Sequence, residues 1–209
     1  MISLIAFLGN VGREYERTRH NAAWIAADHL NICKRLSWQH KFKGAFCSLD
    51  ASRLASWAEE YHLGTSNAQT ASDAIYFLKP ETYMNNSGQS IIALANYYKI
   101  KPEETLIVHD ELELPAGTLS LKWSGGLGGH NGLRSTKAVF GTADFWRLRF
   151  GIGRPSEGVD IADYVLSPFT QENKILLDKA FDKAAVLFAK LLLYPDPAKL
   201  LPEWKKVSV

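Results

Sequence analysis

One histidine, one aspartate and three asparagines stand where loops follow the predicted buried strands of this 209-residue chain. Asn10 follows an apolar run, and His20 comes after a further short loop. Asn85 lies beyond LKPETYM, Asp110 directly follows TLIVH, and Asn131 ends a glycine-rich loop. Ligands of open α/β sheets gather beyond the carboxyl ends of the strands, so these side chains are candidates for one site.

This set of side chains suits hydrolysis by an activated water molecule, without a covalent intermediate. A neutral imidazole at about pH 7 can take a proton from water. A carboxylate on its other ring nitrogen fixes the tautomer and stabilises the imidazolium that forms. Asparagine amides donate and accept hydrogen bonds without titrating, so they can hold peptide groups or support a developing oxyanion.

Other hydrolytic and nucleotide-binding chemistries lack their motifs in this sequence. There is no G-x-S-x-G elbow of a serine esterase and no H-E-x-x-H of a zinc hydrolase. The loop GGLGGHNG lacks the lysine of a P-loop, and the turn at residues 9–12 lacks the full G-x-G-x-x-G spacing. The two cysteines, Cys33 and Cys47, form no CxxC pair, which favours buried, reduced thiols.

Alternating strands and helices must position these residues. The nearly continuous apolar runs at 2–8 and 105–109 predict central strands that are covered on both faces. We predict further strands at 42–49, 74–79, 118–123 and 145–153, and helices at 21–36, from residue 87 onward and at 170–193. The predicted class is α/β, a single domain with a mixed, mostly parallel central sheet flanked by helices.

The predicted domain covers residues 1–194, and the proline-bearing residues 195–209 are expected to form an irregular C-terminal tail. A mixed helical and loop connection is expected over residues 50–73. The chain shows no internal repeat and no linker, which agrees with one domain.

Basic side chains on two predicted strands are candidates for phosphate contact. Lys122, Arg147 and Arg149 alternate with apolar residues of their strands, so all three are expected to face outward. Solvated surface is the ordinary role of such residues. The net charge of +2 permits a local basic patch but does not by itself indicate nucleic-acid binding.

Several separated blocks of the sequence resemble, in the expected order, the bacterial-type peptidyl-tRNA hydrolases. They are FLGNVGREYERTRHN, LKPETYMNNSG, VHDELELPAG, SGGLGGHNGLRS, RLRFGIGRP and YVLSPF. The resemblance implies one α/β domain, no metal and no organic cofactor. It implies hydrolysis of the ester between a peptide, or an N-blocked amino acid, and the 3′-terminal ribose of tRNA, which frees the tRNA for translation.

The resemblance also implies roles for individual residues. His20 matches the general base, and Asp110 its orienting partner. Asn10 is similar to the residue that helps to select peptidyl-tRNA over aminoacyl-tRNA. Other matched positions line the site for the peptide and the tRNA 3′ end: Tyr15, Tyr83, Asn85 and Asn131. Val11 stands where the family usually has proline, so the turn that holds Asn10 lacks that constraint on φ.

Ordinary structural roles are open for several of these residues. Asn10 and Asn131 lie beside glycines, where turn formation is the usual role of asparagine. Core packing is the usual role of Tyr15 and Tyr83, with stacking on a terminal adenosine as the alternative. His130 is expected to shape the glycine-rich loop.

Two other functions stay open at this point. One is a non-catalytic RNA-binding protein on the same scaffold, although the presence of both His20 and Asp110 argues against it. The other is a cofactor-free peptidase or amidase. The first apolar run is too short to span a bilayer and is followed by no cleavage signal, so we expect a cytoplasmic protein. Nothing in the sequence demands a partner subunit, so we expect a monomer.

Overall fold

A computed structural model describes residues 1–50, 53, 56, 59, 74–193 and 196–209. The connection predicted over 50–73 therefore lies almost entirely outside the described residues, and so does the predicted domain boundary after residue 194.

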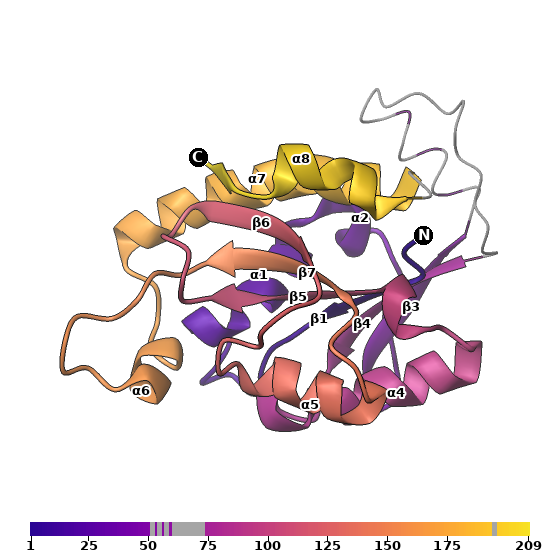
Figure 1. Cartoon of the computed structure of the whole chain (residues 1–209), viewed down its shortest axis with the longest axis horizontal. Coiled ribbons are helices and arrows are strands. Elements are labelled where there is room, and N and C mark those ends of the chain that lie inside the picture. The colour runs from indigo at the N-terminus through magenta and orange to yellow at the C-terminus, as the bar shows by residue number, and fades with distance from the viewer. Residues whose placement is uncertain (51–52, 54–55, 57–58, 60–73, 194–195) are drawn as a thin grey trace.

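In the described part of the chain, eight strands form one mixed sheet in the order β2-β3-β4-β1-β5-β7-β6-β8 (Figure 1). The centre, β4-β1-β5-β7, is parallel, and the remaining pairings are antiparallel. The predicted fold class is thus confirmed. The strands are β1 (Leu4–Phe7), β2 (Gln39–Lys41), β3 (Gly44–Asp50), β4 (Ala74–Pro80), β5 (Thr105–Glu111), β6 (Thr118–Trp123), β7 (Trp146–Gly151) and β8 (Val207–Ser208).

The helical segments of the described residues mostly follow the apolar periodicity of the sequence. They are η1 (Arg19–Asn21), α1 (Ala22–His29), α2 (Asn31–Lys34), η2 (Met84–Asn86), α4 (Ser87–Tyr98), η3 (Pro102–Glu104), α5 (Asn131–Phe140), α6 (Ile161–Val165), α7 (Gln171–Leu193), η4 (Pro197–Leu200) and α8 (Leu201–Trp204). None of the helices in the described ranges is long and apolar enough to cross a membrane.

Two predicted elements differ from the structure because a few residues adopt backbone conformations that interrupt a helix or a strand. The helix predicted at 21–36 is divided, since Leu30 adopts an extended conformation (φ −66°, ψ 120°) between α1 and α2. The strand predicted from residue 42 begins at Gly44. Phe42 and Lys43 have φ values of 58° and 57°, which turn the chain between β2 and β3.

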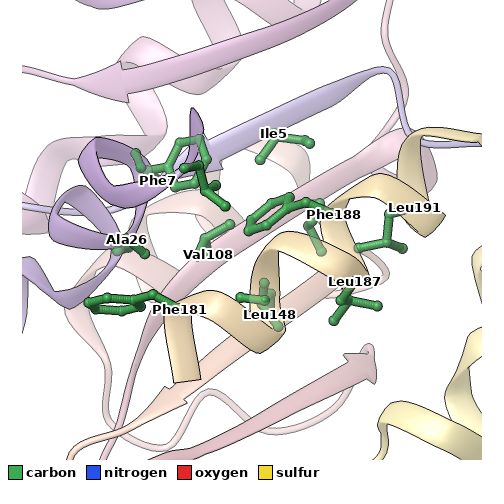
Figure 2. Packing of buried hydrophobic residues seen from close by; sticks show 14 of the residues in the cluster. Ile5, Phe7, Ala26, Val108, Leu148, Phe181, Leu187, Phe188 and Leu191 are labelled. Atoms are coloured by element: carbon green, nitrogen blue, oxygen red, sulfur yellow. The ribbon is translucent and has the colours of Figure 1, made fainter. Parts of the chain in front are cut away.

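The two faces of the sheet are covered by different helices (Figure 1). Apolar side chains of α4 and α5, including Ile91 and Leu133, pack on one face. Helices α1 and α7 pack on the other face, where Phe188 lies 5.8 Å from Phe7 between ring centroids (Figure 2). This burial on both faces fixes β1 and β5, the two strands that lead into the candidate site.

The C-terminal residues are ordered, so the prediction of an irregular tail is wrong for residues 197–208. Trp204 is buried, and Val207 pairs with Leu119 at the edge of the sheet. Both prolines of residues 197–208, Pro197 and Pro202, lie in the first turn of η4 and α8. A proline there gives up no helical hydrogen bond, so proline content did not preclude regular structure.

Candidate active site

His20 and Asp110 meet at the carboxyl ends of the two central strands. β1 and β5 run parallel, with Phe7 opposite Val108, so the segment after β1 and the end of β5 share one sheet edge. The Nδ1 atom of His20 lies 3.0 Å from both carboxylate oxygens of Asp110. An ionised carboxylate only accepts hydrogen bonds, so Nδ1 donates and Nε2 keeps its lone pair. The contact predicted from the sequence is therefore present.

Burial and pairing both act on the protonation of this pair, which is 9% and 3% exposed. Burial raises the pKa of Asp110, but the adjacent His20 and His130 outweigh it and hold that pKa far below the ordinary value of an aspartate. Burial lowers the pKa of His20, but the charge and hydrogen bond of Asp110 outweigh it, and the net pKa is raised. The carboxylate thus favours a proton on the imidazole, as a general base requires.

A second histidine contacts the same carboxylate. Nε2 of His130 lies 3.0 Å from Oδ1 of Asp110, and the rings of His20 and His130 are 5.0 Å apart between centroids. The Nδ1 atom of His130 accepts the backbone N–H groups of Gly132 and Leu133, so this histidine caps α5. The sequence predicted only that it shapes the loop. Histidine is not a typical N-cap residue, so the pattern did not indicate this geometry.

His20, Asp110 and His130 are also the side chains of the described residues that could best hold a metal ion. Their ligand atoms lie within 4.8 Å of one another. In this structure those atoms are joined by the hydrogen bonds described above, which satisfy the buried groups without an ion.

Asn10 is held by a side chain that the sequence analysis did not assign to the site. Its backbone N–H donates to Oδ1 of Asn21 at 2.8 Å, and Nδ2 of Asn21 donates to the Asn10 carbonyl at 2.9 Å. Oδ1 of Asn10 accepts the backbone N–H of Met84 at 2.8 Å. These three bonds fix the turn without a proline at position 11, and they leave the Nδ2 group of Asn10 as its remaining donor.

The five polar residues that follow the strands and loops of the sheet line one cavity of about 570 Å³: Asn10, His20, Asn85, Asp110 and Asn131. The pair of His20 and Asp110 lies on its wall with Asn10, and the exposed Asn85 and Asn131 also line it. Apolar side chains complete the lining, among them Met84, Leu127, Ile161, Val165 and Leu166. Arg134 and Arg154 line it too, although the sequence analysis did not include them.

Close packing of two helices brings the asparagines to this cavity. The backbone N–H of Gly88 in α4 donates to Oγ of Ser135 in α5 at 2.9 Å. A Cβ atom at Gly88 would lie 2.3 Å from the Ser135 carbonyl oxygen, so only glycine allows this approach. The N-termini of both helices, next to Asn85 and Asn131, therefore lie near each other.

The two tyrosines of the matched blocks lie beside the cavity and are not among its lining residues. The rings of Tyr15 and Tyr83 are 6.4 Å apart in an edge-on arrangement, and Tyr83 is half exposed. Tyr83 has φ 60° and ψ 160°, a conformation that costs a residue other than glycine on the order of 1–3 kcal/mol. This backbone turn directs the N–H of Met84 toward Asn10.

Arg147 is buried, which corrects the prediction that it faces outward. The residue is 1% exposed, and its guanidinium donates to the carbonyls of Gly126 and Gly125 at 2.6 and 2.8 Å, with a longer contact to Ala143 at 3.4 Å. The alternation along β7 is as predicted, but the glycine-rich loop after β6 covers this part of the sheet. Arg147 thus supports the loop and is not available to a phosphate.

The other two basic residues remain accessible in different degrees. Arg149 is mostly buried and donates to Glu111 at 3.3 Å and to Ser120 at 2.8 Å. Lys122 is half-buried, and burial together with the nearby arginines lowers its pKa. Cations that repel one another at a partly exposed site are suited to bind an added anion.

Comparisons with known proteins identify the family of this chain. The family model of the peptidyl-tRNA hydrolases matches residues 4–200. A peptidyl-tRNA hydrolase of Treponema pallidum (strain Nichols) is 44% identical over 208 residues, covering 98% of this chain and 95% of that protein. One of Desulfitobacterium hafniense (strain Y51) is 42% identical over 192 residues, covering 90% and 94%. The crystal structure of peptidyl-tRNA hydrolase from Acinetobacter baumannii matches with a TM-score of 0.80 and 33% identity, covering 98% of this chain and 96% of that one. This chain belongs to the peptidyl-tRNA hydrolase family.

Proposed function

We propose that this protein hydrolyses the ester between a peptide, or an N-blocked amino acid, and the 3′-terminal ribose of tRNA. His20 is the general base, and Asp110 orients it. The observation that carries the proposal is the pair of 3.0 Å contacts from His20 Nδ1 to the Asp110 carboxylate. These contacts direct the other ring nitrogen away from Asp110, toward a water molecule in the cavity that His20 lines.

The reaction proceeds by addition and elimination at the ester carbonyl. Nε2 of His20 takes a proton from water while the water oxygen bonds to the carbonyl carbon. The resulting tetrahedral oxyanion collapses, the bond to the ribose oxygen breaks, and the imidazolium returns its proton to that oxygen. Asp110 stabilises the imidazolium between these steps. Amide N–H groups of Asn85 and Asn131 can donate to the oxyanion or to peptide carbonyls.

Asn10 selects for an acylated amino group. Its Oδ1 is occupied by the Met84 N–H, so it offers substrate only the Nδ2 donor. A peptidyl or N-blocked group supplies a carbonyl oxygen to accept that bond. A free aminoacyl group supplies an ammonium instead, which only donates. The two hydrogen bonds between the Asn10 backbone and the Asn21 side chain hold the turn in place, so Asn10 cannot move to reverse this preference.

The tRNA acceptor end lies over the exposed edge of the site. Tyr83, half exposed and braced by Tyr15, offers a ring to the terminal adenosine. Lys122 and the partly buried Arg149 supply positive charge for phosphates. The enzyme acts as a single chain in the cytoplasm, where translation takes place, and uses no cofactor.

The test is release of tRNA from a purified N-blocked aminoacyl-tRNA. His20→Asn should lower turnover by roughly 10²–10⁴-fold while substrate affinity is kept, because general base catalysis contributes that factor. His40→Asn is the matched control, since that histidine lies on β2 and is 79% exposed. Near-normal turnover of His20→Asn would reject the assignment.

The same assay separates the two alternatives. Release that persists with a chelator supports the proposed mechanism. Binding without release would indicate a non-catalytic RNA-binding protein, and cleavage of free peptides alone would indicate a peptidase or amidase.

A further inference from the structure

We infer that His130 is a positioning residue of the site. The N-terminus of α5 fixes the tautomer of the His130 ring, and the ring in that tautomer holds the Asp110 carboxylate in place. The inference rests on the proposed function, because it concerns the same general base. It goes beyond that function by assigning a distinct task to a second histidine.

The tautomer of His130 follows from its backbone contacts. Its Nδ1 atom accepts hydrogen bonds from the N–H groups of Gly132 at 3.1 Å and Leu133 at 3.4 Å. An atom that accepts from two N–H groups carries no proton, so the proton of a neutral ring is on Nε2. Nε2 lies 3.0 Å from Oδ1 of Asp110 and donates to it. The helix N-terminus therefore determines which histidine nitrogen faces the carboxylate.

Asp110 then divides its hydrogen-bonding capacity between two histidines. His20 donates to both oxygens at 3.0 Å, and Oδ1 accepts a second bond from His130. A second donor on Oδ1 stabilises the ionised carboxylate and also weakens its pull on the His20 proton. His130 thus keeps the carboxylate ionised and in place while it limits the basicity of His20.

Other charged and titratable groups around His20 are engaged elsewhere. On β5, His109 donates from Nδ1 to the Asp110 carbonyl. Burial, and to a lesser extent the charge of the nearby His130, hold the pKa of His109 well below its ordinary value. Glu111 is paired with Arg149. Arg154 of the cavity wall is paired with Glu113, and Arg134 of α5 contacts the side chain of Asn131. Among these groups, only His130 joins His20 in contacting the carboxylate oxygens of Asp110.

The N-terminus of α5 links a substrate contact at Asn131 to the general base His20, through His130 and Asp110. His130 is the N-cap of α5, and Asn131, which lines the cavity, is the first residue of that helix. A substrate that bonds to Asn131 is therefore held against the same helix end that fixes His130 and, through it, Asp110.

His130→Asn separates the two contacts of His130. Asparagine is among the best N-cap residues and can accept the same backbone N–H groups, but its shorter side chain does not reach Asp110. The variant should remain folded, with helix α5 capped. The pKa of His20 should rise, so the acid limb of kcat/KM should move to higher pH by on the order of half a unit to one unit. His130→Ala should show the same displacement and, in addition, a lower thermal midpoint.

The decisive measurement is a titration of the imidazole nitrogens of His20 by NMR, in His130→Asn and in the exposed control His40→Asn. We expect the His20 midpoint to rise in the first variant and to be unchanged in the second. In the parent protein, the His130 spectrum should show a bare Nδ1 and a protonated Nε2.

An unchanged His20 midpoint in His130→Asn, or a protonated Nδ1 on His130, would overturn the inference. Neither result depends on catalysis, so it would leave the proposed function standing. Conversely, normal turnover of His20→Asn would reject the proposed function without altering the titration.

Discussion

At Asp110, burial alone would favour a neutral carboxylic acid, yet the side chain accepts hydrogen bonds from His20 and His130. The favourable interactions with the two histidines outweigh desolvation, so the pKa of Asp110 lies far below its ordinary value and the group is ionised at neutral pH. In return, the carboxylate raises the pKa of His20. As the pH falls, His20 therefore becomes protonated, and loses its base form, at a higher pH than an unperturbed histidine does.

Asp110→Asn should reverse that effect. Without the carboxylate, burial dominates the pKa of His20, which should fall below its ordinary value of about 6.5. The acid limb of kcat/KM should move to lower pH, and maximal turnover should fall by less than the roughly 10²–10⁴-fold expected for His20. The check is a pH profile of tRNA release. An acid limb that stays in place would contradict the pairing.

Individual residues were predictable from the sequence to different extents. His20 and Asp110 follow predicted strands that run parallel, so their approach could be expected from the pattern. The roles of Asn21 and His130 could not, because they depend on contacts with backbone groups far along the chain or on an uncommon cap. Such contacts leave no periodicity in the sequence.

At the scale of elements, buried strands and long amphipathic helices were well predicted. The strand at 118–123 has the predicted bounds, and α7 begins one residue after the predicted start. The interruption at Leu30 was not predictable, because apolar spacing continues on both sides of it. The burial of Arg147 was not predictable either. Alternation determines which side of a strand a residue faces, but not what covers that side.

Arg147 holds the glycine-rich loop through the hydrogen bonds from its guanidinium to the loop carbonyls. In Arg147→Lys, a single ammonium cannot span the carbonyls of Gly125 and Gly126 as the guanidinium does. The loop should loosen, with a loss of roughly 1–3 kcal/mol in the free energy of unfolding. Turnover should also fall, because the loop ends in His130 and Asn131. Faster hydrogen exchange of the amides of residues 125–130 is the direct readout.

The matched control for this variant is Lys137→Met, an exposed change on the neighbouring helix α5. It should leave loop exchange and turnover as in the parent. If Arg147→Lys lowers stability but leaves both loop exchange and turnover unchanged, the residue supports the sheet and not the loop.

For the molecule as a whole, the two faces of the sheet differ in chemistry. Helices α1 and α7 bury one face under apolar side chains (Figures 1 and 2). On the other face α4 and α5 cover the central strands, and Lys122 and Arg149 gather at β6 and β7. We propose that Lys122 and Arg149, the basic region of this face, contact phosphates of the tRNA, whereas the cavity binds the acyl group and the ester.

The salt dependence of KM should distinguish binding in the cavity from binding at the basic region. Each phosphate contact makes log affinity fall with log salt with a slope of about −0.9, so one contact is worth about three- to fourfold between about 50 and 200 mM salt. Lys122→Gln should raise KM for N-blocked aminoacyl-tRNA at low salt and reduce the salt slope by about one. It should leave kcat unchanged, and also KM for an N-blocked aminoacyl ester of a single adenosine, which carries no phosphate. Lys179→Gln, an exposed change on α7 across the sheet, is the matched control and should change neither substrate's KM. If Lys122→Gln weakens both substrates equally, Lys122 acts on the cavity itself, and the tRNA body must be bound by other residues.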